Sequence, residues 1–315
     1  MTHYAPLIGA LTTLLVLTFI LTVGKRAIIH DIPNERSLHT KPVPRMGGIA
    51  LLAGVLVGWL MLTPFWSWWI MLPTLGLFLL SLLDDIRNLS ARTRLIVHFM
   101  AALIALSGAN ISLLWLIPLL LFIVWMTNLY NFMDGSDGLA GGMALFGFGS
   151  YGVGAWLSGN EGFALLNFSI ASAALSFLLF NFHPARIFMG DAGSIPLGFL
   201  AATLGIYGWQ DGIWPLWFPL LTFSPFIADA TLTLYQRKCR GEKLSQAHRS
   251  HYYQRLVQMG WGHRNTALSE YALMLLAGAT ALQARNATAE NQIWLLLCWI
   301  ISYGCLSMWI DHSWR

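Results

Sequence analysis

The stretch "NFMDGSDGLAGG", residues 131–142, lies between two long apolar runs and brings Asn131, Asp134 and Asp137 to the edge of a membrane. Ionisable side chains at membrane depth are costly, so they are by default candidates for function. These three positions recur every three residues, and on a helical turn they would share one broad face. The glycines between them allow tight packing of spans or a break in the helix. Packing does not account for two acids and an amide, so we interpret them as part of a binding site.

The flanking apolar runs belong to a pattern that extends along the whole chain. Of its 315 residues, 57% are hydrophobic and 10% are charged, whereas a soluble domain carries roughly a quarter charged residues. About 20 apolar residues cross the hydrocarbon of a bilayer. The predicted spans are 6–24, 47–63, 66–83, 95–111, 112–129, 138–157, 162–181, 193–208, 213–234, 266–283 and 291–310. The sequence therefore predicts one all-α domain over residues 1–315, a polytopic transmembrane bundle of about 11 helices, or about 10 if the stretch 95–129 divides differently.

The distribution of basic residues predicts the orientation of this bundle. With Met1 outside, only Arg285 of the 18 Lys and Arg residues falls on the outer side. Cytoplasmic loops of membrane proteins carry an excess of Lys and Arg. The residues assigned to the inner side include Lys25, Arg26, Arg36 and Arg315. We therefore expect a periplasmic N-terminus, a retained first span and an active site on the cytoplasmic face. The net charge of +4 reflects this topology and does not indicate nucleic-acid binding.

The stretch "LLDDIRNLSARTRL", residues 82–95, places Asp84 and Asp85 where the third span reaches the cytoplasm. Two carboxylates at the negative end of a helix dipole are unfavourable, and neighbouring like charges raise each other's pKa. One interpretation is a solvated helix end balanced by Arg87, Arg92 and Arg94. The other is a pair held for a cation or for proton transfer.

A second acidic motif, "RIFMGDAGS" at residues 186–194, opens the eighth span. Glycine-rich turns that begin a helix offer backbone N–H groups to phosphate. Asp191 in such a turn is better suited to a cation that itself holds phosphate, because carboxylate and phosphate repel. Phe188 is either a lipid-facing aromatic or a platform for a flat base.

Two inner loops add positive charge. "LSQAHRSHYYQRLVQMGWGHR", residues 244–264, alternates apolar and basic residues at roughly helical spacing, with His248 and His251 as neighbours on one turn and Arg249 adding positive charge. It reads either as a basic interfacial helix or as a cap over a diphosphate. "RSLHTKPVPRMGG", residues 36–48, supplies Lys41 and Arg45, either as a basic flank or as a phosphate clamp. Asp229, in the ninth span, is expected to pair with a basic residue of the following loop.

The combined residue types indicate phosphoryl transfer with a divalent metal. The carboxylates are Asp84, Asp85, Asp134, Asp137 and Asp191. No zinc spacing occurs, and the cysteines Cys239, Cys298 and Cys305 are expected to be ordinary packing residues. Hard oxygen ligands favour Mg²⁺, with Mn²⁺ as the alternative, and Mg²⁺ pairs one or two carboxylates with substrate phosphates. Two other enzyme classes with acidic motifs match this sequence less well. The motif of CDP-alcohol phosphotransferases requires Arg where Gly141 stands, and that of membrane prenyltransferases requires Asp where Asn88 stands.

From "RMGG" at 45–48 to "HRSHYYQRL" at 248–256, the motifs resemble the polyprenyl-phosphate N-acetylhexosamine-1-phosphate transferases. The resemblance implies that Asp84 and Asp85 activate a lipid phosphate. It also implies that Asp191, with Asp85, binds Mg²⁺. It further implies a nucleotide-sugar site with catalytic histidines. The remaining residues assigned to that site are Lys41, Arg45, Asn131, Asp134, Asp137, Phe188, His248, Arg249 and His251.

The resemblance also implies the partners and the location. They are a UDP-N-acetylhexosamine and undecaprenyl phosphate, met at the inner leaflet of a bacterial inner membrane by a multi-pass enzyme, with a homodimer as an open alternative. The pentapeptide translocase of peptidoglycan synthesis carries three consecutive histidines where "HRSH" stands, at 248–251. This difference favours the branch that starts O-antigen or other surface polysaccharides, with UDP-GlcNAc, UDP-GalNAc or UDP-FucNAc as donor. The alternatives are the phospho-MurNAc-pentapeptide translocase and, in another class, a transporter of nucleotide-sugars or lipid-linked sugars.

Overall fold

The structure is a computed structural model that describes residues 1–22, 29–33, 37–39, 41–63, 65–87, 89–109, 111–243 and 248–314, apart from the side chain of residue 86. Lys25, Arg26, Arg36, Asn88 and Arg315 therefore lie outside the described residues. The helices of the first half are α1 (Ala5–Thr22), α2 (Gly47–Leu60), α3 (Trp68–Arg87), α4 (Ala91–Ser107), α5 (Leu113–Phe132) and α6 (Leu139–Leu157). Those of the second half are α7 (Glu161–Asn181), α8 (Asp191–Gln210), α9 (Trp217–Thr222), α10 (Ser224–Cys239), α11 (Tyr252–Leu256), α12 (Gly262–Ala284) and α13 (Ala289–Ser313). A 3₁₀ turn (Thr2–Tyr4) precedes α1, a π-turn (Val257–Trp261) precedes α12, and the strands β1 (His30–Asp31) and β2 (Val43–Pro44) pair antiparallel.

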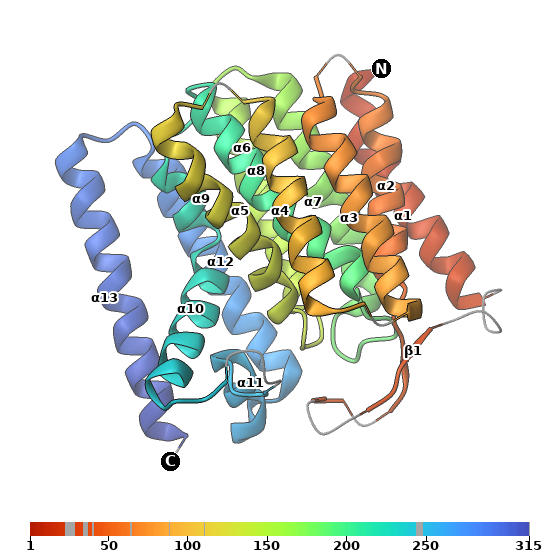
Figure 1. The fold of residues 1–315 in the computed structure, drawn as a ribbon, viewed down its shortest axis with the longest axis vertical. Coiled ribbons are helices and arrows are strands. Elements are labelled where there is room, and N and C mark those ends of the chain that lie inside the picture. Colours follow the sequence, from red (N-terminus) through yellow and green to blue (C-terminus); the bar gives the residue numbers. More distant parts are fainter. Residues whose placement is uncertain are drawn as a thin grey trace.

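The helices form a bundle in which α7 and α8 are central (Figure 1). α7 packs against α1, α2 and α6, while α8 packs against α3 and α5. In the most apolar 18-residue part of each helix, 89% of the residues of α8 are buried and 6% of those of α13, so protein encloses α8 whereas lipid can surround α13. Among the described residues, six helices are long and apolar enough to cross a membrane. The prediction of an all-α polytopic membrane protein is confirmed.

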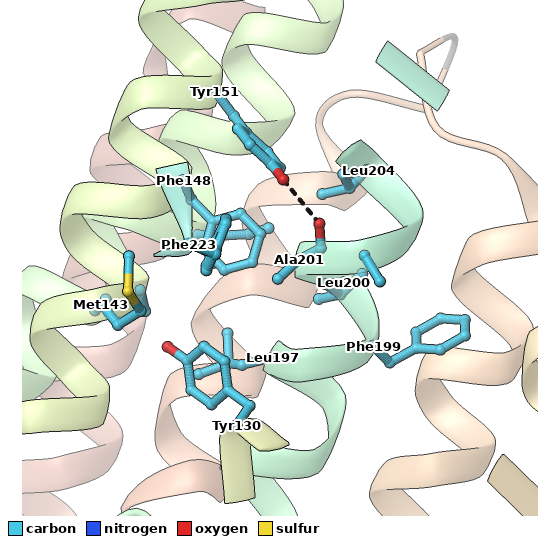
Figure 2. Close-up of a cluster of buried hydrophobic side chains, with 14 of the residues drawn as sticks. Tyr130, Met143, Phe148, Tyr151, Leu197, Phe199, Leu200, Ala201, Leu204 and Phe223 are labelled. Carbon is cyan, nitrogen blue, oxygen red and sulfur yellow. Dashed lines mark hydrogen bonds between the residues drawn. The ribbon is translucent and has the colours of Figure 1, made fainter. Parts of the chain in front are cut away.

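The core between the central helices is closed by aromatic side chains and by hydrogen bonds to backbone carbonyls. Tyr151 of α6 donates its hydroxyl to the carbonyl of Ala201 in α8, at 2.9 Å, beside Phe148 and Phe223 (Figure 2). The hydroxyl of Tyr130, at the end of α5, donates to the carbonyl of Ala140 at 2.7 Å. A buried phenol without a partner would be destabilising. These bonds therefore fix the depth of α5 and α6 relative to α8.

Glycines allow α2 and α8 to begin almost in contact. A Cβ on Gly48 would lie 2.3 Å from the backbone N of Gly193 and 2.8 Å from the carbonyl O of Met189. The backbone N–H groups of Gly47 and Gly48 donate to the carbonyls of Phe188 and Met189, at 2.8 and 2.9 Å. The segment that precedes α8 is therefore held against the start of α2.

Every predicted span contains an observed helix, but the prediction of one continuous span over 213–234 is wrong. α9 ends at Thr222 and α10 begins at Ser224. Pro225 stands in the first turn of α10, where its missing amide hydrogen costs nothing. Its position therefore fits the start of a new helix, although Pro73, Pro118 and Pro196 are accommodated inside α3, α5 and α8. The division of 95–129 into two spans is confirmed, because α4 ends at Ser107 and α5 begins at Leu113.

The cysteines also differ from their expected place. Cys239, Cys298 and Cys305 are all exposed and free, so the prediction that they are ordinary packing residues is wrong. Two of them lie on α13, whose buried residue is Ile310. An apolar sequence predicts membrane depth, but it does not tell lipid-facing from protein-facing positions on one helix.

Candidate active site

A cavity of about 490 Å³ opens at the end of the bundle that carries β1 and α11, opposite Met1 (Figure 1). Segments far apart in the sequence form its wall. The lining residues are Asp31, Ser37, Leu38, His39, Arg45, Asn131, Asp134, Gly135, Ser136, Asn181, Phe188, Gly190, Asp191 and Gln254. Five of the residues singled out from the sequence meet here: Arg45, Asn131, Asp134, Phe188 and Asp191.

Arg45 joins two of the acidic motifs. Its guanidinium Nη2 lies 3.1 Å from Oδ1 of Asp85 in α3 and 2.5 Å from Oδ1 of Asp191 at the start of α8. Burial alone would lower the pKa of Arg45, but Asp191 and Asp85 outweigh this effect and raise it. The guanidinium therefore stays charged, and it neutralises carboxylates that would otherwise repel each other.

A second arginine, Arg94, makes a parallel connection from α4. Its Nη1 lies 3.1 Å from Oδ2 of Asp84 and 3.9 Å from Oδ2 of Asp191. The other oxygen of Asp84 accepts a hydrogen bond from the backbone N–H of Leu89 at 2.7 Å, which closes the turn between α3 and α4. Asp84 and Asp85 thus have separate cationic partners, and both partners reach Asp191.

Asp134 carries a carboxyl group that no arginine neutralises directly. Among the described residues, no Lys, Arg or His forms an ion pair with it. Burial raises the pKa of Asp134 to about 8, the charge of Arg45 opposes this shift, and Asp191 reinforces it. Such a group is readily ionised by a further cation in the cavity.

Asn131, Asp134 and Asp137 do not share one helical face, so that part of the sequence interpretation is wrong. α5 ends at Phe132, and Gly138 adopts a positive φ of 75° before α6 begins. Asn131 accepts a hydrogen bond from the hydroxyl of Ser194 at 3.1 Å. Asp137 is not among the lining residues, and its Oδ2 lies 2.7 Å from Nδ1 of His183. The glycines break the helix, so consecutive polar residues point in different directions.

His263 links two parts of the cavity wall. Its Nδ1 lies 2.8 Å from the hydroxyl of Ser136 and accepts from the backbone N–H of Asp137 at 3.4 Å. Its Nε2 lies 3.4 Å from the carbonyl O of Leu38. Because a carbonyl only accepts and a backbone N–H only donates, the proton belongs on Nε2. The ring of His263 therefore ties the turn after α5 to the segment before β2.

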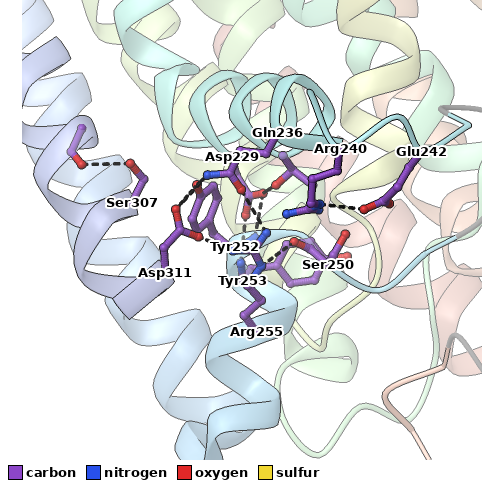
Figure 3. Close-up of polar contacts among 12 residues, drawn as sticks. Asp229, Gln236, Arg240, Glu242, Ser250, Tyr252, Tyr253, Arg255, Ser307 and Asp311 are labelled. Carbon is purple, nitrogen blue, oxygen red and sulfur yellow. Dashed lines mark hydrogen bonds and ion pairs between the residues drawn. The ribbon is translucent and has the colours of Figure 1, made fainter. Parts of the chain in front are cut away.

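The histidine-rich loop is anchored by Asp229 of α10. The two carboxylate oxygens of Asp229 accept the backbone N–H groups of Tyr252 and Tyr253, each at 2.9 Å, and Oδ1 lies 3.1 Å from Nδ1 of His251 (Figure 3). The expectation that Asp229 pairs with a basic residue of the loop is therefore confirmed, with His251 as the partner. A carboxylate at the start of a helix satisfies N–H groups that have no partner within the helix.

This anchor brings α11 to the cavity. The hydroxyl of Tyr253 donates to the carbonyl of Phe132 at 3.1 Å, and Gln254 lines the cavity. α11 is only five residues long and all of it is buried. The segment is therefore a packed cap and not a basic helix lying on the membrane surface.

His248, Lys41 and Arg249 are not among the lining residues in the described part of the chain. Lys41 and Arg249 are exposed. Burial and the neighbouring His251 lower the pKa of His248 to about 4, and its Nδ1 lies 2.9 Å from the hydroxyl of Ser250. His248 is therefore neutral near pH 7, and its catalytic role remains a prediction, as does that of His251.

The chain is similar to known proteins over most of its length. The model of glycosyl transferase family 4 matches residues 67–209. A decaprenyl-phosphate N-acetylglucosaminephosphotransferase of Mycobacterium leprae is 30% identical over 312 residues, covering 82% of this chain and 77% of the relative. The chain belongs to glycosyl transferase family 4.

Two further relatives extend the likeness over most of the chain. A probable undecaprenyl-phosphate N-acetylglucosaminyl 1-phosphate transferase of Bacillus subtilis is 29% identical over 313 residues, covering 93% of this chain and 86% of the relative. A phospho-N-acetylmuramoyl-pentapeptide-transferase of Geobacillus kaustophilus is 30% identical over 268 residues, covering 74% and 81%. The resemblance inferred from the motifs is confirmed at the level of the family.

The carboxylates of this family 4 cavity fit a hard divalent ion that also binds phosphate. Within the described ranges, no group of three or more His, Cys, Asp or Glu is placed to hold a metal ion alone. Mg²⁺ characteristically uses one or two carboxylates and takes its other ligands from water and substrate phosphates. Asp134 and Asp191 line the same cavity and supply that number. Asp85 lies against Arg45, so its assignment as a metal ligand remains a prediction.

Several wall residues were not selected from the sequence. Arg94 was interpreted only as a charge that balances a helix end, and Asp31, His39, Asn181 and Gln254 were not selected. Asn181 donates to the carbonyl of Ile187 at 2.9 Å and accepts from the N–H of Gly138 at 3.0 Å. An Asn at the inner end of an apolar span was a usable signal, because such a side chain needs partners. The others stand in loops or basic flanks, where polar residues are ordinary.

Proposed function

We propose that this chain transfers an N-acetylhexosamine-1-phosphate from a UDP-sugar to undecaprenyl phosphate and releases UMP. The observation that carries the proposal is the meeting of Asp134, Asp191 and Arg45 in one cavity at one end of a membrane bundle. Both cations and acids are needed there, because the donor is a diphosphate and the acceptor is a second phosphate. The names of the family 4 relatives, which act on undecaprenyl or decaprenyl phosphate, support the same reaction.

The donor would lie in the cavity with its diphosphate near Asp134 and Asp191. These two carboxylates would hold Mg²⁺, which supplies charge neutralisation and Lewis-acid activation of the diphosphate when bound. Phe188 offers a flat face for the uracil, and Asn131 and Gln254 offer amide groups for orientation. Binding in a preformed wall lowers the entropy cost of bringing donor and acceptor together.

The acceptor phosphate would approach from the bilayer between the inner ends of α3 and α4. One of its oxygens attacks the β-phosphorus of the donor, and the bond from that phosphorus to the bridging oxygen breaks. The bridging oxygen leaves with UMP, and the sugar phosphate stays on the lipid as a diphosphate. A phosphate dianion is already nucleophilic near pH 7, so Asp84 and Asp85 act chiefly by positioning.

The two arginines stabilise charge as it moves from the acceptor to the leaving phosphate. Arg45 and Arg94 both reach Asp191, at 2.5 and 3.9 Å, and each is also held by a carboxylate of α3. Preorganised cations of this kind stabilise a transition state without a cost of reorientation. They also neutralise the acids when no substrate is bound.

The finer assignments are part of the same proposal. The sugar would be GlcNAc, GalNAc or a deoxy relative such as FucNAc, and the product would start O-antigen or another surface polysaccharide. The enzyme would reside in the bacterial inner membrane with the cavity on the cytoplasmic side. Because relatives named phospho-N-acetylmuramoyl-pentapeptide-transferases match at similar identity, UDP-MurNAc-pentapeptide belongs in the donor panel.

The purified protein should release UMP from a labelled UDP-N-acetylhexosamine when undecaprenyl phosphate and Mg²⁺ are supplied. Asp191→Asn should lower kcat by about 100-fold or more, because it removes a charge that the diphosphate-bound cation needs. The matched control is Asp211→Asn, which alters an exposed acid beyond the other end of the same helix. Wild-type protein that releases no UMP from any donor, or an Asp191→Asn variant with near-normal turnover, would contradict the proposal.

A further inference from the structure

The side chain of His39 lines the cavity with one ring nitrogen left without a partner. Its Nε2 is covered from solvent and has no hydrogen-bond partner in the part of the chain that the structure describes. Oδ2 of Asp31 lies 3.8 Å from this nitrogen, which is too long for a hydrogen bond. Buried polar atoms almost always have a partner. Because His39 lines the cavity, a ligand that enters there could supply the partner that this nitrogen lacks.

The segments that carry His39 and Asp31 are each held by contacts with other parts of the chain. The ring of His39 packs edge-on against Phe188, with centroids 4.9 Å apart and planes at 67°. The carbonyl of Leu38, one residue earlier, lies 3.4 Å from Nε2 of His263. Asp31 stands in β1, where it pairs with Val43 of β2. His39 and Asp31 are therefore presented to the cavity by separate supports.

The chemistry of the two groups indicates a hydroxylated ligand. The carboxylate of Asp31 accepts hydrogen bonds from hydroxyl groups, and an imidazole nitrogen can donate to a hydroxyl or accept from one. The charge on Asp31 would repel a phosphate. Two hydroxyl groups on neighbouring carbons could therefore bond both residues, one to the carboxylate of Asp31 and the other to the imidazole of His39. Both the ribose and the hexosamine of a UDP-sugar carry such hydroxyls.

The position next to Phe188 favours the ribose. If the uracil lies on Phe188, the sugar attached directly to it is the nearest hydroxylated group to His39, whereas the hexosamine lies beyond the diphosphate at Asp191. We propose that Asp31 and His39 together hydrogen-bond the ribose hydroxyls of the nucleotide-sugar donor. This inference rests on the proposed function and adds to it the part of the donor that these two residues recognise.

The test measures whether replacing His39 or Asp31 removes the effect of deleting a ribose hydroxyl from the donor. kcat/KM is measured for UDP-GlcNAc and for its 2′-deoxyribose and 3′-deoxyribose analogues, with the wild type, His39→Ala and Asp31→Asn. In the wild type, loss of a hydroxyl that bonds these groups should lower kcat/KM about tenfold or more. In the variant that lacks its partner, the same deletion should change kcat/KM less than about twofold. Ile32→Ala, an exposed neighbour of Asp31, is the matched control and should keep the wild-type ratio.

Binding of the product provides a second readout for variants with little turnover. UMP and its 2′- and 3′-deoxy forms are titrated into each variant by calorimetry, and the affinity ratio replaces the kinetic ratio. Equal ratios in the wild type and both variants, by either readout, would overturn the proposal. If the variants instead lose discrimination between UDP-GlcNAc and UDP-GalNAc, the pair contacts the hexosamine and the ribose assignment is wrong. A wild type that binds UMP but releases none from UDP-sugars would overturn the proposed transferase and leave this ribose contact intact.

Discussion

Arg45 joins the acidic segments of the cavity to one another. Its guanidinium contacts Asp85 and Asp191, which come from helices that start 123 residues apart (Trp68 and Asp191). Removing one partner of a partly buried ion pair leaves the other charge uncompensated, and this costs more than the pair contributes when intact. At the scale of single residues, the positive charges of Arg45 and Arg94 neutralise the carboxylates that they contact.

Arg45→Ala should lower kcat/KM about 100-fold or more, because Asp85 and Asp191 would then repel each other and the donor would lose a cation. Arg45→Lys keeps a charge but lacks the planar fork, so it should restore only part of the loss. Steady-state UMP release measures both variants. Arg87→Ala, at the exposed end of α3, serves as the control. An Arg45→Ala variant within about twofold of the wild type would show that the bridge is not needed for transfer.

Asp134→Asn should change how thermal stability depends on pH when divalent ions are removed with EDTA. Burial raises the pKa of Asp134 to about 8 from an ordinary value of 3.8, so the folded protein holds this proton more tightly than the unfolded chain does. The resulting stabilisation is fully present below about pH 4 and is lost as the pH rises through about 8. From about pH 6 to about pH 9, the wild-type Tm should fall by several degrees more than that of the variant. Parallel Tm curves for the two proteins would contradict the raised pKa.

Helices and turns show how much of this molecule could be predicted. The spans were predictable because a backbone in lipid must satisfy its hydrogen bonds internally, so apolar runs of sufficient length become helices. The break at Ser224 was not, since Pro225 stands inside an apolar run that reads as continuous. Five of the residues assigned to the site from the sequence line one cavity, and the others do not. The separate directions of Asp134 and Asp137 depend on a turn at Gly138, and the contact of Arg94 with Asp191 depends on tertiary packing that no local pattern records.

Gly48→Ala should destabilise the contact between α2 and α8. The added Cβ would lie 2.3 Å from the N of Gly193, so one helix start must move, and Asp191 lies in the same turn as Gly193. Both the Tm of the detergent-solubilised protein and kcat should fall. Gly76→Ala, in α3, is the matched control because nothing lies within 4 Å of its added Cβ. It should leave the Tm unchanged or slightly higher, since Ala favours a helix by about 1 kcal/mol. Equal Tm changes in the two variants would mean that the close approach is not limiting.

At the scale of the whole molecule, the two ends of the bundle differ in the elements that they carry. β1 and α11, which carry residues of the cavity wall, lie with the C-terminus at the end opposite the N-terminus and the connection between α12 and α13 (Figure 1). Arg285, which the sequence assigns to the outer side, follows the end of α12 and so lies at the end opposite the cavity. An odd number of membrane crossings would produce this arrangement of the termini.

Cysteine labelling in oriented vesicles should confirm the orientation. In a background with Cys298→Ser and Cys305→Ser, Cys239 at the exposed end of α10 should react with a membrane-impermeant maleimide in inside-out vesicles only. Asn286→Cys, in the connection between α12 and α13 and with Cys239 also replaced by Ser, should react in right-side-out vesicles only. The reverse pattern would place the cavity on the outer side and contradict the positive-inside assignment.

α13 has a mechanical consequence for the cavity. Lipid can surround nearly all of this 25-residue helix, yet Asp311 in its last turn bonds Arg255 of α11 and accepts from Gln236 of α10 at 2.8 Å (Figure 3). A helix with few protein neighbours tilts to match the thickness of the bilayer around it. Thinner or thicker bilayers would therefore pull on Arg255, and Gln254 next to it stands in the cavity wall. The acyl-chain length of the host lipids thus becomes a variable that acts on the donor cavity from a distance.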